Sequence, residues 1–141
     1  AGKSWGAEAW AEAQPLADLR LGAGFTLLRK RLHLKPGSTD PDGPFQLGND
    51  PKQQIQLRAS LNLPARQELD LVLRHVGALP QPAVPAYTAL DLRWAWRARP
   101  DLELALIGRN LFDRDPPITP YTNPNYDVIG RYVSGGVKLH F

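Results

Sequence analysis

The chain has 141 residues, enough for one domain, and it contains no cysteine, which excludes a disulfide scaffold and thiol chemistry. Seventeen Lys and Arg residues against fourteen Asp and Glu residues give a formal net charge of +3. The basic residues are scattered rather than gathered in a block, so the sequence does not predict nucleic-acid binding. A transmembrane helix is also excluded, because no run of about 18 apolar residues is present.

Apolar and polar residues alternate with a period of two along much of the first half, which is the pattern of β-strands with one apolar face. The segments with this pattern are residues 5–13, 18–27, 54–63 and 68–74. The first segment is the most ambiguous, because its alanines and glutamates also favour a helix. Short breaks at 15–17 and 64–67 join the four segments into two predicted antiparallel pairs.

The second half of the chain predicts three further strands with the same alternation, at residues 87–97, 102–106 and 131–141. Trp94 and Trp96 fall on the apolar side of the first of these strands. A third short turn, at 98–100, separates the first two strands. The apolar side of the last strand consists of Val133, Val137, Leu139 and Phe141.

Long segments rich in proline, glycine and Asx residues separate these pairs, at residues 33–51, 77–86 and 110–130. Short and long connections therefore alternate along the chain. In an antiparallel meander this places all short turns at one end of the sheet, as in outer-membrane barrels with short periplasmic turns and longer extracellular loops. The sequence predicts an all-β fold, an antiparallel meander of about seven strands, and it places Trp94 and Trp96 near the short-turn interface.

Three segments carry distinctive motifs: NLFDRDPP at residues 110–117, VPAYTALDLRWAW from Val84, and IGRYVSGGVKLHF from Ile129 to Phe141. In combination, and with the opening GAEAWAEAQP followed by LGAGFTLL, they resemble the TonB-dependent receptors of the Gram-negative outer membrane. The resemblance spans nearly the whole chain. It implies that residues 1–141 are the C-terminal segment of a large transmembrane β-barrel, with the plug domain and the earlier strands absent from this chain.

The resemblance also implies a function and a set of partners. Such receptors are barrels of about 22 strands that import scarce nutrients, including ferric siderophores, cobalamin, haem and oligosaccharides, driven by the inner-membrane TonB complex. A ferric siderophore is the substrate that we expect, and no cofactor is predicted. The expected partners are outer-membrane lipid, the barrel-assembly machinery, and the TonB complex, which would be contacted through the absent N-terminal part.

Four residues around the third long connection are candidate ligand contacts. Arg109 and Arg131 flank this connection, and Tyr121 and Tyr126 lie within it. Arginine and tyrosine side chains offer charge-assisted and stacking contacts to an anionic ferric complex. The alternative is a rim that packs only on itself. In the resembled family, a terminal strand such as Val133, Val137, Leu139 and Phe141 is the signal that the barrel-assembly machinery reads.

No catalytic or metal-binding pattern is found in the sequence, so we do not expect an enzyme. His33, His75 and His140 are far apart, and the aspartates near residues 40–50 lack the twelve-residue spacing of a calcium loop. Asn110 and Asp113 are predicted to turn the chain after the sixth strand. Two other functions stay open at this point: a soluble β-sandwich or lectin-like binding module, and a passive outer-membrane porin.

Overall fold

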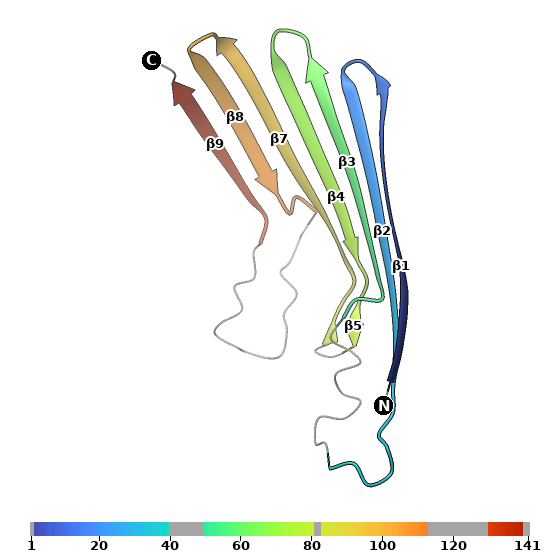
Figure 1. The fold of residues 1–141 in the computed structure, drawn as a ribbon. Helices are drawn as coiled ribbons and strands as arrows, with labels where there is room; N and C mark the ends of the chain where they lie inside the picture. The colour runs from blue at the N-terminus through green and yellow to red at the C-terminus, as the bar shows by residue number, and fades with distance from the viewer. Residues whose placement is uncertain (1, 40–49, 81–82, 113–129, 140–141) are drawn as a thin grey trace.

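The computed structural model describes residues 2–39, 50–80, 83–112 and 130–139, and their main feature is a single antiparallel sheet (Figure 1). Its strands are β1 (Gly2–Leu16), β2 (Leu19–Leu32), β3 (Gln53–Leu63), β4 (Gln67–Val76), β7 (Tyr87–Arg99), β8 (Leu102–Arg109) and β9 (Tyr132–Leu139). They lie side by side in the order β1-β2-β3-β4-β7-β8-β9. The prediction of an all-β meander of seven strands is confirmed. The sheet is not closed, since β1 and β9 form its two edges.

Two features extend the predicted pattern. β1 and β2 continue beyond the predicted segments, and their pairing runs to Gly2 opposite Leu32. Backbone hydrogen bonds hold this extension, although its side chains no longer alternate between apolar and polar. The segment 77–86, expected to be a loop, contains the short strands β5 (Leu79–Pro80) and β6 (Ala83–Val84), which form a separate two-stranded sheet.

The connections are arranged as the sequence predicts. The short turns between β1 and β2, β3 and β4, and β7 and β8 lie together at one end of the sheet, and the long connections leave from the other end (Figure 1). In the turn between β3 and β4, Ala65 and Arg66 both have positive φ angles, 58° and 61°. Consecutive residues of this kind match the twist of a tight hairpin.

The register gives the sheet two different faces. Directly paired residues of an antiparallel sheet point to the same side, and the pairs connect Phe25 to Ala9 and Ile55, and Leu69 to Leu61 and Trp94. The side that these residues share is called the apolar face. Its apolar residues include Ala9, Ala11, Ala13, Leu21, Ala23, Phe25, Leu27, Ile55, Leu57, Ala59, Leu61, Leu69, Leu71, Leu73, Leu90, Leu92, Trp94, Trp96, Leu104, Leu106, Val133, Val137 and Leu139.

The opposite side, called the polar face, carries most of the charged residues of the strands. It includes Glu8, Glu12, Arg20, Arg58, Glu68, Asp70, Arg74, Asp91, Arg93, Arg97, Glu103 and Lys138. Among the described residues, the buried hydrophobic residues are Ala89 and Ala95, which share this face with much longer side chains. The sheet therefore has no packed apolar core of its own within the described residues.

Large side chains of the apolar face are exposed. The exposed fraction is 45% for Leu57, 62% for Val133 and 69% for Val137. The seven strands form one layer, not the two packed sheets that a sandwich requires. In the described part of the chain, no helix is long and apolar enough to cross a membrane.

Candidate functional site

The polar face is organised around Arg93 on β7. Its Nη1 donates hydrogen bonds to Asp70 Oδ2 at 3.0 Å and to Glu68 Oε2 at 3.2 Å, both on β4. On the other side, its Nη2 lies 3.9 Å from Glu103 Oε1 on β8, and Arg97 Nη2 lies 3.8 Å from the second oxygen of Glu103. One network of charges therefore crosses three neighbouring strands.

The network extends toward β3, and a separate ion pair joins β4 to β7 on the same face. The Ser60 hydroxyl donates to Asp70 Oδ1 at 2.8 Å, and Arg74 Nη2 donates to Asp91 Oδ2 at 2.8 Å. The side chain of Arg93 is 38% exposed and that of Arg74 is 44% exposed, so these pairs keep contact with water. Ion pairs that are this exposed stabilise a fold only weakly. Because its charged side chains keep contact with water, the polar face is suited to line an aqueous space.

Trp10 is an aromatic residue on the polar face of β1, opposite Gly24 on β2. Its ring lies against Gly22 and Gly24, where a Cβ would approach ring carbons to 3.2 Å and 2.4 Å. The Arg58 guanidinium lies 5.7 Å from the ring centroid, within cation–π range. Trp10 is not among the residues predicted from the sequence. The signal for it is the Gly-x-Gly pattern in β2, since glycines in a strand leave room for a neighbouring ring.

A cavity of about 310 Å³ lies beside this ring, and its lining on the polar face includes Glu8, Trp10, Thr26, Gln54, Gln56 and Arg74. They combine amides, a hydroxyl, a carboxylate and a guanidinium with an aromatic ring. Such a set donates and accepts hydrogen bonds beside a stacking surface, so it can bind a polar solute.

Two of the four predicted ligand contacts lie close together. Arg109 ends β8 and pairs with Tyr132, the first residue of β9, and Arg131 directly precedes Tyr132. Both arginines are exposed at the end of the sheet where the long connections leave. Tyr121 and Tyr126 lie outside the described residues. The ligand role of these four residues stays a prediction.

The aromatic and terminal residues of the apolar face lie where the alternation predicts. Trp94 and Trp96 have ring centroids 6.3 Å apart, and the Trp94 indole N–H donates to Gln67 Oε1 at 2.9 Å, beside the turn between β3 and β4. Val133, Val137 and Leu139 are exposed on the same face. Phe141 lies outside the described residues, and the role of these four residues in assembly stays a prediction.

Asn110 turns the chain at the end of β8, as predicted. It has a positive φ of 51°, and its backbone N–H donates to Asp91 Oδ1 at 3.0 Å. The next N–H, of Leu111, donates to the Leu90 carbonyl at 2.9 Å, and the Leu111 side chain lies over Gly108. The first residues of the NLFDRDPP motif are therefore fixed against β7. Asp113 lies outside the described residues.

The described histidines lie apart from the charge network. His75 is on the apolar face, where its Nδ1 lies 2.9 Å from Thr88 Oγ1. Within residues 2–39, 50–80, 83–112 and 130–139, no three or more His, Cys, Asp or Glu side chains are grouped so as to hold a metal ion.

Comparisons with protein-family models, curated proteins and solved structures found no match to this chain. The two faces of the sheet, together with the sequence motifs, are therefore the basis for a functional interpretation.

Proposed function

We propose that this chain is the C-terminal barrel segment of a TonB-dependent transporter in the outer membrane of a Gram-negative bacterium, and that the transporter imports a ferric siderophore. One observation carries the proposal: the apolar residues of the seven neighbouring strands of the sheet share one uncovered face, and a hydrated charge network occupies the other. A sheet with these two faces is suited to separate lipid from a watery lumen. The motifs at 110–117 and 129–141 point to the family by resemblance.

The length of the strands supports a membrane-spanning location. The apolar face of β2 is free of charged residues over 19–27, and that of β3 over 55–63. These stretches agree with the roughly 9–11 residues that a strand tilted by about 45° needs to cross a bilayer. Trp94 and Trp96 lie at the short-turn end of this band, where aromatic residues mark a membrane interface.

The ends of the sheet support an orientation. Short turns gather at one end, which we assign to the periplasm, and the long connections leave from the other. Arg109 and Arg131 are exposed at the second end, where an anionic ferric complex would arrive from outside the cell. The TonB complex would act through parts of the transporter that precede this chain. The barrel-assembly machinery would read the strand that contains Val133, Val137, Leu139 and Phe141.

Membrane insertion can be tested on the chain itself. The chain is folded in detergent, mixed with phosphatidylcholine vesicles, and separated by flotation after removal of the detergent. We expect the chain to float with the vesicles and to resist extraction by alkaline carbonate. A chain that is monomeric and cooperatively folded in plain buffer would contradict the proposal and favour a soluble binding module.

Transport can be tested on the full-length protein. The coding sequence upstream of Ala1 should contain a plug domain and a TonB-contacting segment, and their absence would contradict active transport and favour a passive porin. Cells that express the full-length protein should accumulate labelled ferric siderophore in a TonB-dependent manner. Labelled cobalamin and oligosaccharide serve as controls for the substrate, and uptake of only one of these controls would contradict the siderophore assignment.

A further inference from the structure

The few charged side chains on the apolar face are basic. In the regularly paired parts of the strands they are Lys3 on β1 and Arg29 and Arg31 on β2. Lys3 pairs with Arg31 and Trp5 pairs with Arg29, and no register shift separates these pairs from the pair of Ala9 with Phe25, which is on the apolar face. All carboxylates of the seven strands are on the polar face: Glu8, Glu12, Glu68, Asp70, Asp91 and Glu103.

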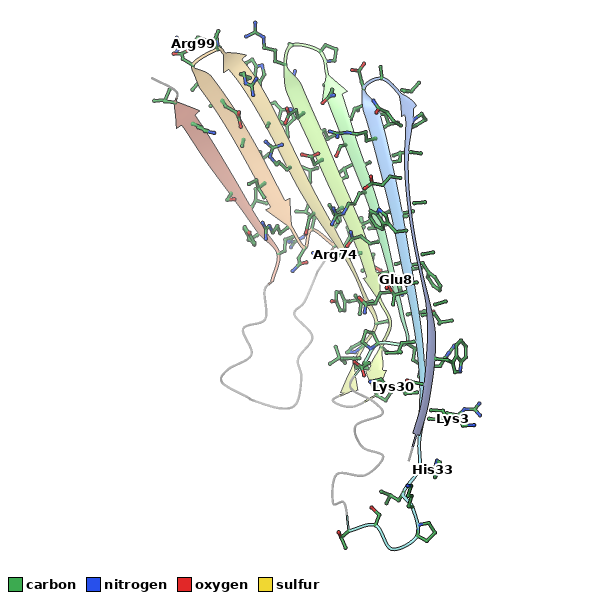
Figure 2. All side chains as sticks on the ribbon, viewed as in Figure 1. Lys3, Glu8, Lys30, His33, Arg74 and Arg99 are labelled. Atoms are coloured by element: carbon green, nitrogen blue, oxygen red, sulfur yellow. The ribbon has the colours of Figure 1, made fainter. Side chains whose placement is uncertain are left out.

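One further basic residue is a separate case. Arg99 lies beyond a register shift in β7, beside a short turn, and it forms an ion pair with Asp101. Figure 2 shows Arg99 at that turn and Lys3 at the opposite end of the sheet. The positive charge of Lys3, Arg29 and Arg31 is therefore confined to the end from which the long connections leave.

The surroundings of these residues favour an anion. Trp5, Arg29 and Arg31 line a cavity of about 320 Å³ together with Leu28, Lys30, Asp50 and Lys52, and Lys3 lies across the strand pair from Arg31. Asp50, the carboxylate in this lining, is paired with Lys30. Among the described residues, no ion pair holds Lys3, Arg29 or Arg31. Guanidinium groups bind phosphate oxygens through two parallel hydrogen bonds, so Arg29 and Arg31 are suited to a phosphate group.

An apolar depression lies on the same face, nearer the middle of the sheet. It has a volume of about 610 Å³, and its lining includes the small residues Ala11, Ala23 and Ala59 between the larger Leu57, Leu73 and Phe112. Along β2, the distance from Ala23 to Arg29 is about 20 Å at 3.3 to 3.4 Å per residue. With the strand tilted by about 40°, this corresponds to about 15 Å along the bilayer normal, which is half of a hydrocarbon core of about 30 Å.

We infer that this face of β1, β2 and β3 binds an anionic phospholipid-type molecule, with its head-group phosphate on Lys3, Arg29 and Arg31 and an acyl chain in the alanine-lined depression. The inference rests on the proposed function, because the face is open to lipid only if the sheet spans a membrane. Lipid is favoured over free phosphate because the basic cluster and the apolar depression lie on one face at the separation of a head group and the middle of its acyl chain.

The test measures which lipid stays with the chain. The whole chain is reconstituted into vesicles of equal parts phosphatidylcholine and phosphatidylglycerol, extracted in mild detergent, and analysed by mass spectrometry for the lipid that it retains. We expect phosphatidylglycerol to be enriched over phosphatidylcholine. The R29Q/R31Q variant should lower this enrichment by roughly tenfold or more, since each basic residue at an anionic surface contributes about fivefold.

A matched control loses two positive charges from the polar face. The R20Q/K138Q variant should retain the wild-type enrichment, because Arg20 and Lys138 point away from the apolar face. The A23L variant, which fills the depression, should reduce the phosphatidylglycerol retained per chain while leaving the basic cluster in place. Excess inorganic phosphate should not displace the lipid.

The possible failures are distinguishable. Equal retention of both lipids by the wild type, or an enrichment that survives in R29Q/R31Q, overturns the lipid site while leaving membrane insertion intact. Displacement by inorganic phosphate overturns it in favour of a simple phosphate site. Failure of the chain to insert into vesicles of phosphatidylcholine alone contradicts the proposed function, and the lipid site with it.

Discussion

The indole ring of Trp10 lies against Gly24 so closely that a Cβ at position 24 would come within 2.4 Å of the ring atom Cε3. Both residues are on the polar face, and they are directly paired between β1 and β2. The ring also lies over Gly22, with the Arg58 guanidinium 5.7 Å from its centroid. Trp10 therefore fixes the edge strand β1 to β2 and to a side chain of β3.

This contact predicts the effect of a single methyl group. Gly24→Ala should lower the free energy of unfolding by about 1–3 kcal/mol, the usual cost of overpacking, because the ring has to move off β2. The measurement is a urea titration of the chain folded in detergent micelles, followed by circular dichroism. Gly136→Ala is the matched control, since a Cβ there meets no atom within 4 Å on the same face. If Trp10→Ala does not reduce the cost of Gly24→Ala, the contact is not its cause.

A second prediction concerns the backbone of Asn110. Asparagine and glycine adopt a positive φ more readily than β-branched residues, so Asn110→Val should lower the free energy of unfolding by about 1–3 kcal/mol. Asn110→Gly should cost less than half as much, because glycine adopts this conformation without strain. Both values come from the same urea titration. Equal losses in the two variants would indicate that the side chain of Asn110, and not its backbone, stabilises the turn.

Much of the fold follows from local sequence, because the alternation needs only the residues of one strand. The predicted segment 54–63 differs from β3 by one residue. The extensions of β1 and β2 were not predicted, since Lys3, Arg29 and Arg31 replace apolar residues on the alternating side. The strands β5 and β6 were missed because prolines in 77–86 favour a loop.

The site was less predictable than the fold, because it depends on register between strands. Arg93 meets Asp70 and Glu68 only because Asp70 pairs with it across β4 and β7, and a long connection separates these strands in sequence. The position of Trp10 over Gly24 likewise requires the exact pairing of β1 with β2. Local patterns identified which residues share a face, but the contacts between their side chains required the paired strands.

A third prediction concerns the charge network. Arg93→Met should lower the free energy of unfolding by about 1 kcal/mol, because exposed pairs contribute little individually while three carboxylates share this guanidinium. The loss should shrink in about 1 M salt, where the screening length falls to about 3 Å. Arg20→Met is the control, since Arg20 forms no ion pair among the described residues. A loss that is independent of salt would indicate that Arg93 acts through packing.

A fourth prediction uses two neighbouring residues of β4 that point to opposite faces. Leu71 is on the apolar face, paired with Ala59 and Leu92, and Val72 is on the polar face, paired with Arg58 and Asp91. An arginine on the lipid side near the middle of a membrane-spanning strand costs about 2–4 kcal/mol, whereas substitutions on the lumen side are better tolerated. Leu71→Arg should therefore weaken the partition of the chain into phosphatidylcholine vesicles by roughly 30-fold or more. Val72→Arg adds the same charge one residue away and should change the partition much less. Equal losses in both variants, or a larger loss for Val72→Arg, would contradict the assignment of the apolar face to lipid.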